Sequence, residues 1–311
     1  MHNAKLKRIL NILLIVAAYG FLGYKIATYD NYAGLLEQFR RADAWQWLWL
    51  AGCVMLFPLN RFFEAWKWQY LVRNIEPMNL IEAQRQVYYG TIAGFVTPYK
   101  LGEYPGRALL FRQTEQNWLT ATCLGLIGGY AMTTVIVLSG LPAAIGWFTS
   151  AQSLWWSVAL VLVMAVVAFA ALPAVMRRLR KHQWKSEQSR MLVNTIADLT
   201  MRDVAILTAQ SLLRYAVILL QLYLTLLFCC IQLPALTTIL TMTLYYMLIT
   251  VTPNVPAAEI AVRGAWAVVL FEPFGTDITA AAVIATMLLW AVNTILPLIV
   301  GSLVKRTARE E

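Results

Sequence analysis

Long apolar stretches, separated by short charged segments, dominate the pattern of hydrophobic and polar positions along the chain. A helix needs about 20 mainly apolar residues to cross a bilayer. Stretches of this kind cover residues 9–27, 45–63, 118–139, 154–172, 204–228 and 278–304. Two further apolar stretches, residues 80–96 and 236–251, are shorter and each leads into a Thr-Pro dipeptide. The pattern therefore predicts six transmembrane helices and two segments that enter the membrane without crossing it.

Each short apolar stretch is followed by a version of the same motif. The first copy reads Val-Thr-Pro at residues 96–98 and continues to Glu103 and Arg107, whereas the second reads Val-Thr-Pro at residues 251–253 and continues to Glu259 and Arg263. In both copies the arginine follows the glutamate by four residues, so the two side chains lie on one face of a helix. About half of the 311-residue chain separates the two copies. The sequence therefore has the form of an internal repeat, with one copy of the motif in each half of the chain.

The motifs also contain residues that break helices. Gly102, Gly106 and Pro105 stand in the first copy and Pro256 in the second. Glycine permits tight turns, and proline suits the first turn of a new helix. We therefore expect two re-entrant helical hairpins, at about residues 80–112 and 236–272. Irregular backbone at membrane depth is tolerated only where protein or a water-filled cavity surrounds it.

Composition and charge place the chain in a membrane and orient it. The residues are 60% hydrophobic and 13% charged, which is too apolar for a soluble protein of this size. The net charge of +9 comes from basic residues that gather between the apolar stretches, most densely in residues 177–203. By the positive-inside rule, this loop and both termini lie in the cytoplasm, and a nucleic-acid partner is not expected. The later part of the loop has the pattern of an amphipathic surface helix.

With this orientation the two copies are inverted. The hairpin at 80–112 enters from inside and the hairpin at 236–272 from outside, so residues 1–150 and residues 151–311 form repeats of opposite orientation. The predicted fold is an all-α polytopic membrane protein with six transmembrane helices and two re-entrant helical hairpins in an inverted repeat. Transporters of this architecture bind their substrates near the membrane midplane, where the repeats meet. A duplicated gene for a protein that only resides in the membrane is the alternative.

Charged side chains inside the membrane are the candidate functional residues. A central charge costs about 2.5 to 3.5 kcal/mol on insertion scales, so each must be paired or face water. We expect the arginines to hold an anionic headgroup and the glutamates to position them or to receive a cation. A structural salt bridge within each motif is the alternative. The predicted substrate-binding residues are Thr97, Pro98, Gly102, Glu103, Arg107, Arg214, Thr252, Pro253, Glu259 and Arg263. Secondary candidates on neighbouring apolar stretches are Gln210, Gln221, Asn60, Arg61 and Asn293.

The paired motifs resemble those of the lysylphosphatidylglycerol synthase transmembrane-region family, also described as flippase-like domains. The resemblance covers roughly residues 7–305. It implies a bacterial cytoplasmic (inner) membrane protein that moves a lipid, or helps to move it, between leaflets, with the motif residues lining the cavity. Two departures from the family pattern limit what the resemblance implies for this chain. The chain ends at Glu311 without a soluble catalytic domain, so lipid aminoacylation is not expected, and residues 254–258 replace a glycine-rich turn.

The predicted function is that of a flippase-like transporter, which moves a lipid with an anionic or zwitterionic headgroup through a polar cavity at the midplane. A non-catalytic membrane subunit that presents a lipid to a partner glycosyltransferase or other lipid-modifying enzyme is the alternative. An enzyme is not expected, because His2 and His182 lie in cytoplasmic segments. A lipid transferase that uses Glu103 and Glu259 is a third hypothesis. We expect no cofactor, and the four cysteines lack the spacing of a metal site.

Overall fold

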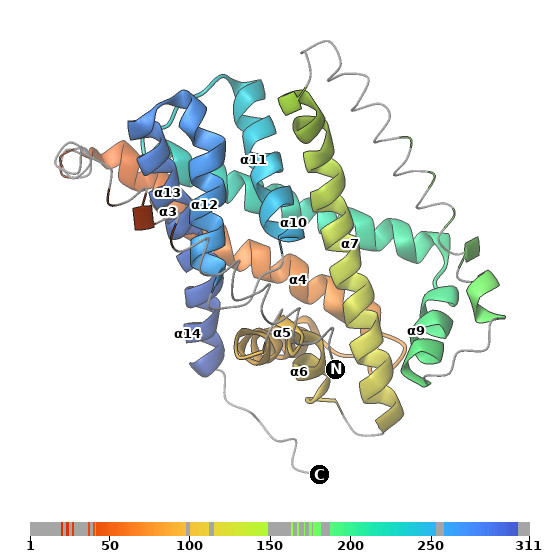
Figure 1. The fold of residues 1–311 in the computed structure, drawn as a ribbon. Coiled ribbons are helices and arrows are strands. Elements are labelled where there is room, and N and C mark those ends of the chain that lie inside the picture. Colours follow the sequence, from red (N-terminus) through yellow and green to blue (C-terminus); the bar gives the residue numbers. More distant parts are fainter. Residues whose placement is uncertain are drawn as a thin grey trace.

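The computed structural model describes residues 42–97, 100–111, 115–148, 187–252 and 258–303, together with scattered positions between 20 and 40 and between 163 and 181. In these residues every regular element is a helix (Figure 1). The first and fourth predicted spans, residues 9–27 and 154–172, lie outside the continuously described ranges, so the prediction of six spans is not tested there.

Three helical segments in the described part of the chain are long and apolar enough to cross a membrane. The first, Asn117–Gly146, lies within α7 (Glu115–Phe148), and the second is α10 (Met201–Phe228). The third, Thr276–Leu303, is built from consecutive helical pieces. These pieces are α13 (Thr276–Trp290), the π-helical turn η4 (Ala291–Ile295) and α14 (Leu296–Leu303). The spans predicted at 118–139, 204–228 and 278–304 are thus confirmed as membrane-length helices.

The span predicted at residues 45–63 corresponds to two consecutive helices. The first, α3 (Ala44–Met55), begins at Asp43, whose carboxylate accepts a hydrogen bond from the Gln46 amide at 2.9 Å. The second, α4 (Phe57–Val72), starts with a proline in its first turn and continues well past residue 63. Lys67 lies beyond the predicted span, but it is helical and buried. The predicted span ends too early because charged residues usually mark the end of an apolar stretch, whereas here a nearby carboxylate offsets the charge of Lys67.

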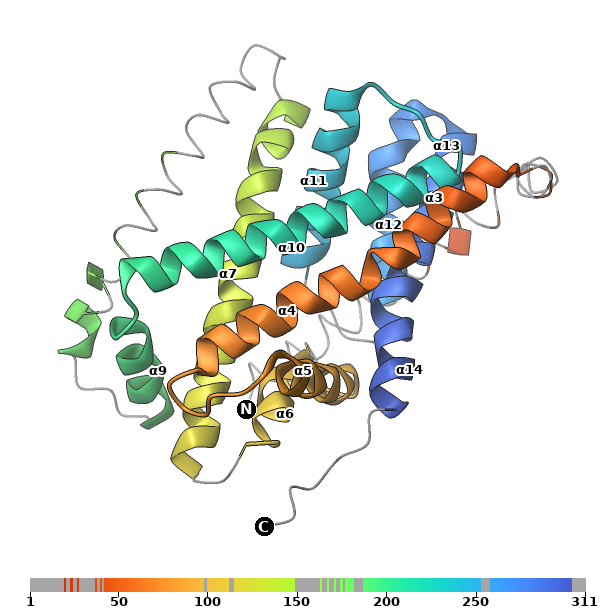
Figure 2. The same cartoon turned by 180° about the vertical axis from the view of Figure 1, so that it is seen from behind.

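Helices α3 and α4 lie antiparallel beside α10 (Figure 2). At one end, Arg73 Nη2 donates to Asp203 Oδ1 at 2.6 Å. Further along, Gln221 Nε2 donates to the carbonyl oxygen of Cys53 at 3.0 Å. Residue numbers therefore fall along α4 and α3 as they rise along α10. This register determines which polar side chains of the two helices face each other.

At both predicted hairpins the structure has two helices in contact, whereas their re-entry into the membrane stays a prediction. The first pairs α5 (Leu80–Phe95) with α6 (Glu103–Ala108), and the second pairs α11 (Ala235–Val251) with α12 (Glu259–Phe271). The 3₁₀ turn η3 (Glu272–Phe274) ends the second pair. Helix α5 also packs against α14, and α11 packs against α7. Each hairpin therefore contacts the membrane-length helix that follows the other hairpin in sequence.

Glycines allow close contact between these helices. A Cβ atom added to Gly90 of α5 would lie 2.4 Å from both Arg107 Cγ and the carbonyl oxygen of Glu103. A Cβ atom added to Gly140 of α7 would lie 2.4 Å from the Cβ of Met247 on α11. Small residues let the backbones of membrane helices approach in this way. In the first hairpin, this contact fixes the position of the motif side chains.

The later part of the basic loop also forms a helix, α9 (Glu187–Ala197), which packs against α7. The amphipathic helix expected in this part of the loop is therefore helical in the structure. The division into repeats at residues 1–150 and 151–311 stays a prediction, because residues 149–162 lie outside the described part of the chain.

Candidate functional site

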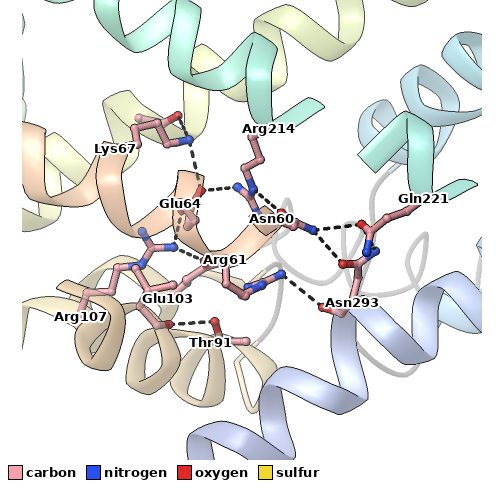
Figure 3. A network of polar contacts seen from close by, with 12 residues as sticks. Asn60, Arg61, Glu64, Lys67, Thr91, Glu103, Arg107, Arg214, Gln221 and Asn293 are labelled. Carbon is pink, nitrogen blue, oxygen red and sulfur yellow. Dashed lines mark hydrogen bonds and ion pairs between the residues drawn. The ribbon is translucent and has the colours of Figure 1, made fainter. Parts of the chain in front are cut away.

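A buried group of charged side chains is centred on Glu64 of α4 (Figure 3). Its carboxylate accepts a hydrogen bond from Arg107 Nη2 of α6 at 2.6 Å and pairs with Arg214 Nη1 of α10. Lys67 Nζ, one turn further along α4, lies 3.3 Å from the same carboxylate. One carboxylate thus holds three cations from three helices. Glu64 is 3% exposed, so water does little to screen these interactions.

Cations outnumber carboxylates in this group. Arg107 also pairs with Glu103, as the spacing of four residues predicted. Arg61 extends from α4 toward η4 and donates from Nη2 to the carbonyl oxygen of Asn293 at 3.4 Å. The network then has two carboxylates, Glu64 and Glu103, against the four cations Arg61, Lys67, Arg107 and Arg214. The difference is an excess of two positive charges.

Arg107 is the most constrained of these cations. It is 1% exposed and pairs with both carboxylates of the network. Its guanidinium carbon lies 5.4 Å from the ring centroid of Trp68 and 5.1 Å from that of Tyr104. Cations at this distance from a ring face are attracted by its electron density. Its Nε is buried without a hydrogen-bond partner among the described residues, so Arg107 retains a donor for a ligand.

Amide side chains extend the network toward the π-helical turn η4. Asn60 Nδ2 donates to Asn293 Oδ1 at 2.8 Å, and Asn60 Oδ1 accepts from Arg214 Nε at 3.0 Å. Asn293 Nδ2 in turn donates to Gln221 Oε1 at 3.1 Å. Single π-helical turns inside α-helices are frequent at functional sites. The amides therefore connect α4, α10 and η4 beside the charged group.

A second charged group forms where the two motifs meet. Glu259 accepts hydrogen bonds from Arg263 Nη2 at 3.1 Å, as the sequence spacing predicted, and from Lys100 Nζ at 3.2 Å. Lys100 belongs to the first motif, so this contact joins the two hairpins. Glu259 is 2% exposed, and its Oε2 atom has no hydrogen-bond partner in the described part of the chain.

The predicted threonines and glycine shape the backbone of the motifs. Thr97 Oγ1 accepts a hydrogen bond from the Gly102 amide at 2.8 Å. A Cβ atom at Gly102 would lie 2.6 Å from the Ala93 carbonyl oxygen, so the turn requires glycine. In the second motif, Thr252 Oγ1 accepts from Trp266 Nε1 at 2.9 Å. These contacts give the three residues structural roles.

The structure thus places the charged residues of the predicted site in two groups. Glu103, Arg107 and Arg214 lie in the Glu64 network, whereas Glu259 and Arg263 form the group with Lys100. Pro98 and Pro253 lie outside the described residues. No cluster of three or more His, Cys, Asp or Glu side chains suited to a metal ion occurs in the described ranges.

Sequence reasoning missed Glu64 and Lys67. Glu64 follows Asn60 on α4 by four residues and Lys67 follows Glu64 by three, so the three side chains share a face of the helix. A polar stripe of this kind on α10 consists of Gln210, Arg214 and Gln221, which are all among the residues predicted from the sequence. Glu64 and Lys67 lie just beyond the predicted span 45–63, where charged residues normally mark the end of an apolar stretch.

Comparison with a protein-family model identifies the family of this chain. None of the curated proteins compared with it matches. The family model described as the lysylphosphatidylglycerol synthase TM region matches residues 8–301, which is nearly the whole chain. The match agrees with the apolar helices of membrane length and with the membrane domain that they predict. The chain belongs to the lysylphosphatidylglycerol synthase TM region family.

Proposed function

We propose that this protein is a flippase-like lipid transporter, which moves a lipid with an anionic or zwitterionic headgroup between the leaflets of the membrane. The observation that carries the proposal is the excess of two positive charges in the buried Glu64 network. A charge held at membrane depth is costly unless it is neutralised. An anionic group that reached the network would offset the excess, so the site favours anions over cations.

The geometry suggests how such a group would bind. Arg107 and Arg214 hold the carboxylate of Glu64 between them, and guanidinium groups bind carboxylates and phosphates with the same planar array of donors. A phosphate that enters the network would bind these guanidinium groups beside the Glu64 carboxylate and offset the excess of positive charge. In this mechanism Glu64 holds the arginines in place in both the empty and the loaded site, and the headgroup supplies the further negative charge.

The arrangement of the helices supports alternating exposure of the site. Arg107 comes from the first proposed repeat and Arg214 from the second, so their shared contact with Glu64 lies where the repeats meet. Helix α5 packs on α14, and α11 packs on α7. Each hairpin therefore contacts the other proposed repeat, as expected of duplicated halves. We propose six transmembrane helices and two re-entrant hairpins in an inverted repeat, with rocking of the halves as the transport step.

The proposal includes a location and a topology. The basic segment 177–203 favours the cytoplasmic side by the positive-inside rule, and both termini would lie on that side of a bacterial inner membrane. The substrate would be a membrane lipid, and the protein would act without catalysing a reaction.

The test is lipid translocation by the purified protein in liposomes. An anionic phospholipid labelled on its acyl chain is followed by its accessibility to a quencher that cannot cross the membrane. Wild type is compared with Arg107→Ala and with Arg180→Ala, which removes the same charge from a half-exposed pair with Asp198. We expect wild type and Arg180→Ala to exchange the lipid, and Arg107→Ala to be slower by about tenfold or more, as expected from the loss of at least 1.4 kcal/mol.

Absence of translocation above empty liposomes would overturn the proposal. Binding of the labelled lipid by such an inactive wild type would favour a subunit that presents lipid to a partner glycosyltransferase. Equal slowing in Arg107→Ala and Arg180→Ala would also contradict the assigned site.

A further inference from the structure

Helix α10 carries two fully buried glutamines with opposite hydrogen bonding. Gln221 is 0% exposed, donates to the Cys53 carbonyl oxygen at 3.0 Å and accepts from Asn293 at 3.1 Å. Gln210 is 1% exposed, and neither its Oε1 nor its Nε2 has a hydrogen-bond partner among the described residues. Buried polar side chains are nearly always hydrogen-bonded, so Gln210 requires an explanation that Gln221 does not.

The register of α10 against α4 places Gln210 next to the Glu64 network. Asp203 pairs with Arg73, and Arg214 pairs with Glu64. Gln210 lies between Asp203 and Arg214 on α10. Lys67 lies between Glu64 and Arg73 on the α4 side of these two pairs. Gln210 is therefore level with Lys67 and one turn from Arg214 on the same face of α10.

Neighbouring groups add to the unused hydrogen-bonding capacity. Lys67 Nζ donates to the Gly128 carbonyl oxygen at 3.2 Å and pairs with Glu64, which accounts for two of the three hydrogens of its ammonium group. The hydroxyl of Ser211, next to Gln210 in sequence, is also buried without a partner in the described part of the chain. Lys67, Gln210 and Ser211 thus retain unused hydrogen-bond donors, and Gln210 and Ser211 also retain unused acceptors.

The chemistry of these groups points to a hydroxyl-bearing ligand. A side-chain amide both donates and accepts, as an alcohol does, whereas an anionic phosphate only accepts. Gln210 is one α-helical turn from Arg214, about 6 Å along the axis. A small polyol esterified to a phosphate in the Glu64 network can extend over that distance.

We infer that Gln210, with Lys67 and Ser211, forms a second subsite that binds hydroxyl groups of a headgroup whose phosphate occupies the Glu64 network. The inference rests on the proposed transport function and narrows its substrate class to anionic phospholipids with a hydroxylated headgroup. Because the subsite is buried in this conformation, the headgroup reaches it only when α4 and α10 separate. The Gln210 amide is left without partners in the absence of the headgroup.

The test compares two acyl-labelled lipids in liposomes that contain wild type or Gln210→Leu. Phosphatidylglycerol and phosphatidylmethanol carry the same net charge and differ in the headgroup hydroxyls. We expect wild type to translocate phosphatidylglycerol about tenfold faster, the effect of about 1.4 kcal/mol. In Gln210→Leu the ratio of the two rates should fall close to one. An unchanged ratio in this variant, or a wild-type ratio near one, overturns the inference while leaving the transport proposal in place. Failure of wild type to move either lipid overturns both.

Thermal unfolding in detergent gives a second readout. Replacement of Gln210 by leucine removes two buried polar atoms without partners, so we expect a higher melting temperature, as is common when a binding site is made apolar. Gln221→Leu is the matched control on the same helix and should lower the melting temperature, because it leaves Asn293 and the Cys53 carbonyl oxygen without a partner. An equal fall in both variants would show that Gln210 is satisfied in the resting protein and would overturn the subsite.

Discussion

At the scale of single residues, Glu64 controls the charge balance of the site. Its carboxylate is the contact shared by Arg107, Arg214 and Lys67. Removal of one partner from a buried ion pair costs about 3 to 5 kcal/mol, because the remaining charge stays buried without compensation. In a transporter the same property favours substrate binding, since a site with uncompensated positive charge accepts an additional anion.

We predict that Glu64→Gln lowers the melting temperature of the protein in detergent by several degrees, because Arg107, Arg214 and Lys67 lose the carboxylate that they share. The matched control is Asp198→Asn, which removes the same charge from a pair with Arg180 whose side chains are 66% and 49% exposed. Exposed pairs contribute about 0 to 1 kcal/mol, so this variant should melt close to wild type. Equal melting of Glu64→Gln and Asp198→Asn would show that the network does not depend on Glu64.

At the scale of helices, the contact between α5 and α6 positions Arg107. Gly90 is the closest point, where the side chain of Arg107 and the backbone of Glu103 occupy the space that a Cβ atom would fill. Since backbone atoms cannot rotate away as a flexible side chain can, a larger residue must move α6 relative to α5. The position of Arg107 relative to Glu64 would change with it.

Gly90→Ala should therefore reduce both stability and translocation. The added Cβ meets two atoms at 2.4 Å, and overpacking of this kind costs about 1 to 3 kcal/mol. The control is Gly23→Ala, where an added Cβ meets no atom of the described residues within 4 Å. Melting temperature and lipid exchange are measured for both variants. Wild-type behaviour of Gly90→Ala would contradict the close contact between the two helices.

Local sequence patterns predicted much at this scale. Apolar length alone predicted α7, α10 and the α13–α14 segment, and the paired motifs predicted both helical hairpins. The spacing of four residues predicted the pairs Glu103 with Arg107 and Glu259 with Arg263. Such local patterns do not predict contacts between segments that are distant in the sequence. Local spacing cannot show that Glu64 reaches two other helices, or that Lys100 crosses to the second motif.

At the scale of the whole molecule, the contact between Lys100 and Glu259 joins the first motif to the second. The two residues are 159 positions apart, which is about half of the 311-residue chain. The Lys100 side chain is 45% exposed, whereas that of Glu259 is 2% exposed. A contact of this kind between two hairpins can form in one transport conformation and break in another. It is therefore a candidate link between the motions of the two halves.

A double-mutant cycle tests this coupling. We predict that Lys100→Met and Glu259→Gln each slow lipid exchange, and that the double variant is no slower than the slower single variant. Residues that act through one contact give non-additive effects, whereas independent sites add. Lys181→Met, at an exposed position on the basic segment, is the control for the loss of a lysine. Additive effects of Lys100→Met and Glu259→Gln would contradict a functional contact between the hairpins.

The most direct test of the central claim is the headgroup selectivity of the wild-type protein. Liposomes are prepared with acyl-labelled lipids of matched chains that bear either an anionic phosphodiester or a cationic quaternary ammonium headgroup, and their rates of translocation are measured at the same ionic strength. Because the network carries an excess of two positive charges, we predict that the anionic lipid moves at least about tenfold faster. Equal rates for the two lipids, or faster movement of the cationic lipid, would contradict the claim that the Glu64 network is the headgroup site.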